Sequence, residues 1–467
     1  MINTQLLKIV QTFSAKDKRN ARYWIDSPMH NKRTDVKLLY DFVWQYLQRP
    51  EQLSKQAAWQ AIYPKVAYKD GKMRQIIFQL QRNLEHFLQY QQLQQQPTQA
   101  ALLLLDSFAE RQCHDLLDLY LQQAQKLLKQ QPAQNWQTLR QQYQLETIIY
   151  EQAETAQRTS PLNLQELSDT LDVQYFADKL RRACLLYSRL VVFQMDYQPR
   201  MLEVVLAQVA DSNHLSIPAI AVYYYCYLSL TAIEQNDHYF EQMMQELEKH
   251  RTLFPAPEVR DLYLLAINYT IKRLNTGSDW HLQKAFELYQ TGIREGFLLV
   301  DNQLSAFTYN NIVSIGISIQ KYNWVEQFMK QYQTHIAQEY QQGVVKECWA
   351  KLYYAQKKYA KAQTLLAQID TKDILRLLSS KILLAQIYYE TQELDALESL
   401  LHSLKTYLYR KEVVGYHRQY YQTVVTYMLK LLRNNSYDLK ATAALRTAIE
   451  TANGLTPTIR KWLLQQF

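Results

Sequence analysis

The chain has 467 residues, a formal net charge of +8 and only 8 glycines, of which Gly71 alone precedes Gly277. The first half of the chain therefore lacks the glycines that tight β-hairpins and phosphate-binding loops require. This argues against a sheet-rich fold or a nucleotide-binding loop there. Residues 1–95 hold 15 Lys and Arg against 7 Asp and Glu, so the whole positive excess lies at one end.

The rest of the composition favours helices. Leu, Gln, Ala, Lys and Glu dominate, and all are good helix formers, so we expect an all-α fold. The four cysteines lie far apart and form no CxxC pair, which indicates buried, reduced thiols. The chain has no run of about 18 apolar residues. It also has no signal-peptide pattern, so we expect a cytoplasmic protein without a membrane span.

Residues 1–95 predict a small basic helical N-terminal domain. Amphipathic spacing indicates one helix or two short ones over residues 5–24. Further along, Ser54 is a candidate N-cap for a short helix that Pro64 ends. A longer helix follows and carries apolar residues 73–88 on one stripe.

The segment from Leu53 to Leu88 resembles the helix-turn-helix part of winged-helix transcription activators. The resemblance implies that five cations contact phosphates, namely Lys65, Lys69, Lys72, Arg74 and Arg82. Two features depart from that pattern: no glycine-bearing wing follows, and the exposed helix face offers Gln rather than Arg. Nucleic-acid binding, contact with an acidic protein and a solvated face that opposes self-association stay open as three interpretations.

A glutamine-rich tract over residues 89–99 predicts the first domain boundary, with Pro97 as the break. Beyond it, prolines separate further helices, and no strand pattern competes. We therefore divide the chain into the basic N-terminal domain, a helical linker region with degenerate helix pairs over residues 96–215, and a repeat array with C-terminal capping helices over residues 216–467.

Self-similarity at a fixed interval is the clearest signal in the last region. In AKLYYAQKKYAKAQTLLAQI, Ala350, Tyr359 and Ala362 stand at the spacings of a tetratricopeptide (TPR) repeat. A second copy begins 35 residues later at Ala385, and a weaker one lies 34 residues earlier at Gly316. Small residues let the two helices of a pair cross closely, so the pattern predicts a right-handed superhelix of TPR-like hairpins.

The chain also resembles an uncharacterised bacterial family of TPR-like helical-repeat proteins, nearly from end to end. The resemblance is carried by SPMHNK, LSKQAAWQAIYP, MRQIIFQLQRNLEHFL, YNNIVSIGISIQKYNWVEQFMKQY, the repeats at 350 and 385, and KWLLQQF. It implies a fold and no biochemical role.

The sequence offers no catalytic constellation. HExxH, GxSxG, GxGxxG and GxxxxGK[ST] are all absent, and we expect no enzymatic activity, no cofactor and no metal site. The 36 tyrosines include doublets that turn one ring outward on a helix, where it offers contact area to a partner. Packing between repeats is the competing interpretation.

Our leading hypothesis is an interaction or scaffold protein that binds a peptide or helix along the first helices of its pairs. The candidate partner contacts are Tyr354, Tyr389, Asn310, Asn311 and Lys351. The alternative is a nucleic-acid-binding regulator that uses the basic N-terminal domain, with the repeats for sensing or dimerisation. The partner's identity and self-association stay open.

Overall fold

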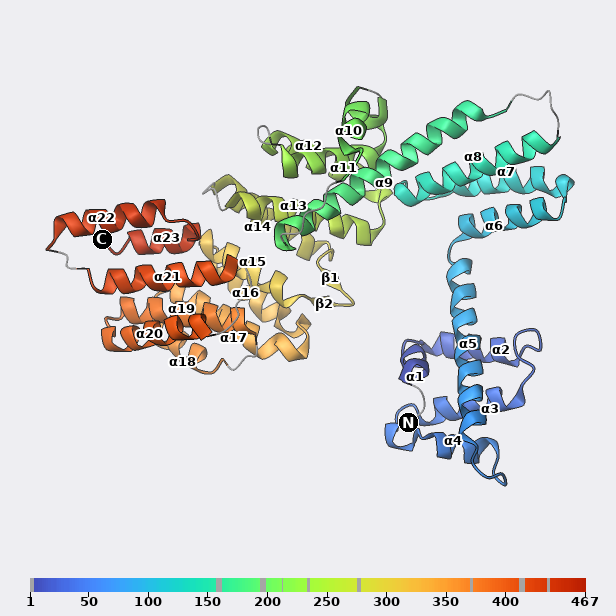
Figure 1. Ribbon diagram of the computed structural model, residues 1–467, viewed down its shortest axis with the longest axis horizontal. Helices are drawn as coiled ribbons and strands as arrows, with labels where there is room; N and C mark the ends of the chain where they lie inside the picture. Colours follow the sequence, from blue (N-terminus) through green and yellow to red (C-terminus); the bar gives the residue numbers. More distant parts are fainter. Residues whose placement is uncertain are drawn as a thin grey trace. The chain divides into compact units, whose positions relative to one another are not determined.

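The computed structural model describes residues 4–156, 162–193, 199–211, 213–232, 236–274, 279–369, 373–410, 416–434 and 437–467. Within them the chain forms 23 α-helices, many packed as consecutive hairpins, and one antiparallel pair of very short strands (Figure 1). The all-α prediction is confirmed. Among these helices, none has the length and apolar character needed to cross a membrane.

The chain divides into two compact units, and the first comprises Met1–Gln131 and Gln137–Asp172. Its helices are α1 (Thr4–Gln11), α2 (Ala15–Asp26), α3 (Thr34–Tyr46), α4 (Lys55–Ile62), α5 (Asp70–Gln94), α6 (Pro97–Glu110), α7 (His114–Gln130) and nearly all of α8 (Trp136–Ala156), with a 3₁₀ turn at Pro50–Gln52.

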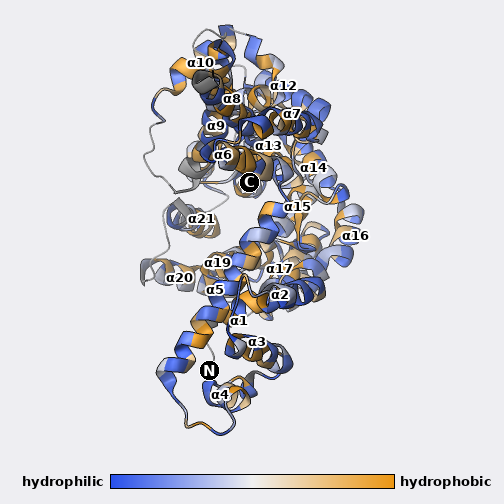
Figure 2. Cartoon of the chain, turned by 90° about the vertical axis from the view of Figure 1, so that its right-hand side faces the viewer, coloured by the Kyte–Doolittle hydropathy of each residue, from blue (hydrophilic) through white to orange (hydrophobic). Residues whose placement is uncertain are grey.

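Helices α1 to α5 enclose one hydrophobic core that includes the fully buried Tyr40 and Trp59. Residues 5–24 form two helices because the Ser14 hydroxyl accepts from the backbone N–H of Asp17 and completes a capping box that starts α2. The Ser54 hydroxyl accepts from the backbone N–H of Ala57 and caps α4, as predicted. The predicted stripe on α5 is buried in this core, and Figure 2 shows hydrophobic segments, in orange, among hydrophilic ones along this helix.

The second unit comprises Pro132–Trp136 and Val173–Phe467. Its helices are most of α9 (Leu164–Phe193), α10 (Leu202–Asp211), α11 (Pro218–Thr231), α12 (Asn236–His250), α13 (Ala256–Leu274), α14 (Asp279–Arg294), α15 (Ala306–Ser318), α16 (Tyr322–Tyr332), α17 (Gln338–Ala355), α18 (Tyr359–Ala367), α19 (Ile374–Glu390), α20 (Leu394–Arg410), α21 (Tyr416–Leu432), α22 (Leu439–Thr451) and α23 (Pro457–Leu464). Three 3₁₀ turns lie at Asn213–Ser216, Arg251–Leu253 and Gln333–His335.

Three successive pairs, α15–α16, α17–α18 and α19–α20, end their first helices with the same turn. One residue takes a left-handed backbone, and the next donates its N–H to a carbonyl five residues earlier, as in a Schellman motif. The left-handed residues are Gln320, Lys357 and Gln392, with φ of 60°, 57° and 62°. A shared turn at matching positions is what a repeat requires, and none of the three is glycine.

Packing within these pairs follows the predicted small residues. Ala350 and Ala362 are fully buried in one cluster with Tyr353 and Tyr359. At Gly316 a Cβ atom would lie 2.5 Å from Val325 Cγ2 on the paired helix α16, closer than side-chain atoms approach, so this crossing needs glycine.

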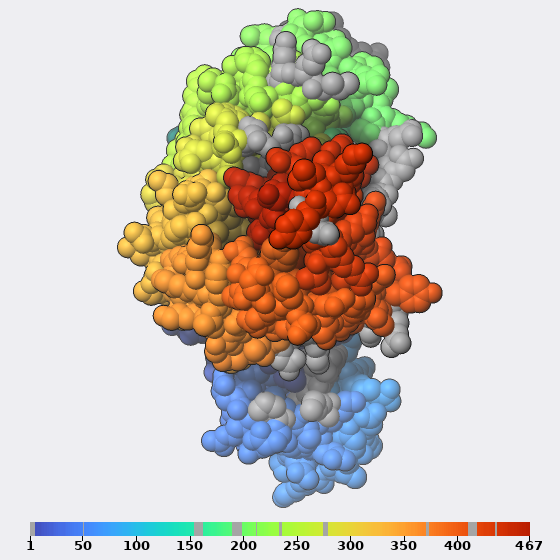
Figure 3. Space-filling view, turned by 90° about the vertical axis from the view of Figure 1, so that its left-hand side faces the viewer, coloured from blue at the N-terminus to red at the C-terminus, as the bar shows by residue number. Residues whose placement is uncertain are grey.

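The C-terminal helices close the array. Trp462 and Leu463 of α23 are buried in one core with Leu397 and Leu401 of α20 and with α21. Figure 3 shows this C-terminal segment, in red, lying directly against the orange segment of the preceding pairs. The last helix therefore covers apolar surface that the final pair cannot bury alone.

A short hairpin was not predicted from sequence. Strands β1 (Leu299–Val300) and β2 (Gln303–Leu304) pair antiparallel, with Leu299 opposite Leu304. Asp301 and Asn302 form its turn with φ of 49° and 60°. This combination is typical of the tight turn whose twist matches two antiparallel strands.

Candidate functional site

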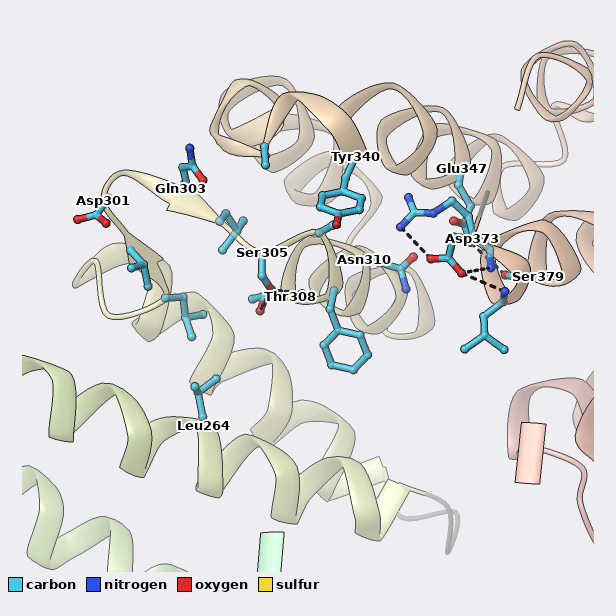
Figure 4. Close-up of a pocket in the computed structure, with 18 of the residues that line it drawn as sticks. Leu264, Asp301, Gln303, Ser305, Thr308, Asn310, Tyr340, Glu347, Asp373 and Ser379 are labelled. Carbon is cyan, nitrogen blue, oxygen red and sulfur yellow. Dashed lines mark hydrogen bonds and ion pairs between the residues drawn. The ribbon is translucent and has the colours of Figure 1, made fainter. Parts of the chain in front are cut away.

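The candidate site is a cavity of about 990 Å³ in the second unit. It is lined by the hairpin and by the first helices of successive pairs, α13, α15, α17 and α19, together with Tyr421 of α21. Figure 4 shows Leu264 of α13 on one wall and Glu347 and Ser379 toward the other. The volume is at the upper end of what small-molecule pockets span.

Four large apolar side chains that line the cavity stay exposed. The exposed fractions are 72% for Phe307, 50% for Tyr340, 44% for Val300 and 38% for Leu375. Single exposed apolar residues are ordinary, whereas several around one cavity are a feature of interaction surfaces. In Figure 4 the Tyr340 ring extends from α17 toward the start of α15, where Thr308 and Asn310 are labelled.

A chain of polar contacts joins three of the lining helices. The Nζ atom of Lys351 donates to Oδ1 of Asn310 at 2.7 Å and to Oε1 of Glu347 at 2.9 Å. The Ser379 hydroxyl donates to the same oxygen of Glu347 at 3.0 Å. The Glu347 side chain is only 6% exposed, so these contacts compensate for burying its carboxylate and fix the spacing of α15, α17 and α19.

Three helices begin at the edge of this cavity. The N-cap residues Ser305 of α15, Ala337 of α17 and Asp373 of α19 all line it. Ser305 and Asp373 accept hydrogen bonds from the first turns of their helices, whereas Ala337 has no side chain that could do so. The partial positive charges of three helix N-termini therefore converge on one cavity.

Arg376 is a mostly buried charged group of the lining whose hydrogen-bonding capacity is only partly met. Its side chain is 14% exposed, and its Nη2 atom lies 3.8 Å from Oδ2 of Asp373, near the limit for an ion pair. Its Nη1 atom is buried, and no acceptor reaches it within the described residues. The guanidinium rests against α17 at Gly343, where a Cβ atom would lie 3.6 Å from Cδ of Arg376. Sequence patterns give no signal for this arrangement.

The predicted partner contacts are only partly brought together. Asn310 lines the cavity, and Lys351 is bonded to it from the next pair. Asn311 lies elsewhere on α15 and donates to the Tyr289 hydroxyl at 3.3 Å. None of Lys351, Asn311, Tyr354 and Tyr389 is part of the cavity lining.

Tyr354 and Tyr389 lie at the far end of α17 and α19, against α23. The Tyr354 hydroxyl donates to Glu390 at 3.0 Å, and the Tyr389 ring packs edge-on against Trp462 with centroids 5.6 Å apart. Burial and the neighbouring carboxylate of Glu390 raise the pKa of Tyr354 well above its ordinary value. Tyr354 and Tyr389 thus make specific contacts within the chain, as the packing interpretation expects. Partner binding by these residues stays a prediction.

The five predicted phosphate contacts lie around the turn between α4 and α5 and along α5. Three interact within their own unit, namely Lys72 with the Tyr63 ring at 4.1 Å, Arg74 with Asp70 at 2.9 Å and Arg82 with Glu85 at 3.4 Å. Lys65 and Lys69 are exposed. Helix α5 is followed by α6 after two residues, so no hairpin wing lies beside it.

Metal and disulfide chemistry receive no geometric support where the structure describes the chain. No three His, Cys, Asp or Glu side chains there gather into a group that could hold a metal ion. The four cysteines are unpaired thiols, and burial raises the pKa of Cys348 to about 12. A pKa this high keeps the thiol protonated and unreactive near neutral pH.

Comparison with known proteins adds no family: no family model, no curated protein and no solved structure matches the chain. The resemblance to TPR-like bacterial proteins therefore stays a prediction. The helical hairpins that the resemblance implies are present in the structure.

Proposed function

We propose that this protein is a cytoplasmic interaction scaffold whose TPR-like pairs form a right-handed superhelix, preceded in the chain by a basic N-terminal domain. It binds a segment of a protein partner along the cavity between the hairpin and the first helices of α13 to α20. The mechanism is binding alone, without catalysis, cofactor or metal.

The exposed apolar surface at the cavity carries this proposal. Phe307 and Tyr340 come from adjacent pairs, and both present rings that are at least half exposed. Aromatic rings supply large contact area with little side-chain entropy to lose, so they are frequent anchors in interfaces. The bonded chain through Lys351 and Glu347 holds the two pairs in register before a partner arrives, which lowers the cost of binding.

Site-specific photo-cross-linking in cells tests the proposal. A photoreactive phenylalanine analogue at Tyr340 should give a discrete cross-linked partner, and Phe307→Asp in the same chain should abolish it. The matched control places the analogue at Tyr409 of α20, which is 83% exposed and outside the cavity. Identical products from both positions, or a Tyr340 product that survives Phe307→Asp, would contradict the proposal.

Nucleic-acid binding by the N-terminal residues is the second candidate. The observation that favours it is the local excess of cations, of which Lys65 and Lys69 are exposed. Fluorescence anisotropy with a labelled duplex should then show affinity that falls steeply between about 50 and 200 mM salt. Lys65→Glu with Lys69→Glu should remove most of it. A flat response at the lower salt concentration would exclude this candidate.

A further inference from the structure

We infer that the occupant of this cavity is an internal acidic segment of a partner protein. An apolar side chain of the segment sits on Phe307 and Tyr340, and a neighbouring Asp or Glu carboxylate pairs with Arg376. The inference rests on the proposed function, because it specifies the chemistry of the partner at the same site.

The charge of the segment follows from the unmet hydrogen-bonding capacity of Arg376. A guanidinium has five N–H donors, and a buried donor without an acceptor is costly. Here the covered Nη1 has no acceptor among the described residues, and Nη2 has only a long ion pair to Asp373. The side chain keeps 14% of its surface exposed, and a further acceptor binds at that exposed part. A carboxylate is the planar acceptor whose two oxygens match the guanidinium fork.

The helix N-termini at the cavity favour the same charge. Helices α15, α17 and α19 have 13, 18 and 17 residues, and all three begin at the cavity edge. Each N-terminus acts as roughly half a positive charge, and the start of α17 has no side-chain cap. A lysine-rich segment would meet these dipoles and Arg376 with the wrong sign.

The acidic residues of the lining do not cancel this preference. Glu347 is already engaged by Lys351 and Ser379, and one oxygen of Asp373 accepts from the first turn of α19. The third acidic residue, Asp301 of the hairpin turn, is matched in charge by Arg260 of α13, the other cation of the lining. The presence of these acidic residues does disfavour a phosphate group, which carries close to two negative charges at neutral pH. A singly charged carboxylate meets less repulsion than a phosphate in a lining that holds three acidic residues beside two cations.

The position of Arg376 in the row of helices favours an internal residue over a chain terminus. The lining extends from Leu264 of α13 to Tyr421 of α21, and Arg376 belongs to α19, between these limits. A segment that rests on Phe307 of α15 and reaches Arg376 can continue past it toward α21. The carboxylate is therefore a side chain of the segment.

Fluorescence anisotropy with two labelled peptides tests the inference on the full chain. One peptide has a leucine flanked on both sides by glutamates among alanine and serine, and the other has glutamine at each glutamate. The glutamate peptide should bind roughly tenfold to a hundredfold more tightly, the range expected for a hydrogen-bonded charge pair. In Arg376→Gln that ratio should collapse toward one, and in Arg376→Lys it should be intermediate.

Two control variants separate the inference from the proposed function. Arg446→Gln removes a cation of α22, 60% exposed and outside the cavity, and should leave the ratio unchanged. Phe307→Ser should weaken both peptides equally. If Phe307→Ser weakens both but Arg376→Gln leaves the ratio intact, the cavity binds segments and the carboxylate assignment is wrong. If Phe307→Ser changes neither peptide, the proposed site itself fails.

Two further outcomes overturn the inference. Equal binding of the glutamate and glutamine peptides by the unmodified chain removes the charge preference. Tighter binding of a peptide in which phosphoserine replaces the glutamates, if lost in Arg376→Gln, would assign the site to phosphate instead. Thermal unfolding followed by circular dichroism verifies that each variant retains its helices.

Discussion

The two ends of α19 carry charges in opposite circumstances. At its C-terminal end, the Glu390 carboxylate accepts hydrogen bonds from Tyr354 at 3.0 Å, Tyr359 at 2.5 Å and the indole of Trp462 at 2.9 Å. At its N-terminal end, Arg376 has one distant partner and a buried nitrogen without an acceptor. The helix thus begins with an unmet charge and ends with a fully matched one.

This difference distinguishes a charge that stabilises the fold from a charge that can bind another molecule. A charge whose hydrogen-bonding needs are met inside the chain stabilises the fold and has nothing left to offer. A charge whose needs are unmet costs free energy until another molecule supplies the missing group. We therefore expect changes at Glu390 to act on stability and changes at Arg376 to act on binding.

Glu390→Ala should have the largest effect on stability. It leaves the donors of Tyr354, Tyr359 and Trp462 without their acceptor, and we expect a loss of about 1 to 3 kcal/mol, with water replacing part of the bonding. Because unfolding of an array need not be all-or-none, hydrogen exchange of the α23 amides is the appropriate measurement.

Glu393→Gln is the matched control for that experiment. Glu393 is exposed and accepts hydrogen bonds from Gln363 and Thr391. It lies three residues from Glu390 but has no aromatic donor among the described residues. Its replacement should leave the protection of α23 within about 0.5 kcal/mol of the original. Equal effects of the two variants would show that the protection of α23 does not depend on Glu390 in particular.

Tyr354→Phe should have a smaller effect, about 0.5 to 1.5 kcal/mol, because it deletes one of three donors and keeps the ring in place. Trp462→Tyr is no substitute, since it changes both the donor and the packing against Tyr389. Combining Tyr354→Phe with Glu390→Ala should add less than the sum of the two. Additivity of the two effects would break the proposed link between these residues.

The hydrogen bonds to Glu390 also make the stability of this region depend on pH. Burial would raise the pKa of Glu390, but the hydrogen bonds from Tyr359, Trp462 and Tyr354 outweigh it and hold the pKa below its ordinary value of 4.5. The folded state therefore favours the charged form, and its contribution is present above about pH 4.5 and lost as the pH falls through the lowered pKa. Exchange of α23 should accelerate in acid, and Glu390→Gln should flatten that dependence.

The packing within each helix pair could be predicted from the sequence, because it depends on residues that lie close together in the chain. Ala350, Tyr359 and Ala362 fall within one pair, and a small residue at each crossing is required whatever lies beyond. The hairpin at residues 299–304 was missed because two-residue strands are too short to show a period. Asp301 and Asn302, both tolerant of left-handed backbone, were its only signal.

The candidate site was predicted less well because it depends on contacts between distant elements. Tyr354 was expected to face a partner, but its hydroxyl bonds to Glu390, a carboxylate that also accepts from Trp462, 72 residues further along the chain. Arg376 was not singled out at all. Its unmet nitrogen results from where α17 and α19 place the side chain, which no pattern within α19 encodes.

The smallest effect on stability is expected at Arg376. Arg376→Gln should change the stability of the unbound protein by less than about 0.5 kcal/mol, because the long contact to Asp373 contributes little and a buried donor without an acceptor is removed. Thermal unfolding and hydrogen exchange of α17 and α19 measure it. A loss comparable to that of Glu390→Ala would mean that Arg376 is structural, and the distinction between the two ends of α19 would disappear.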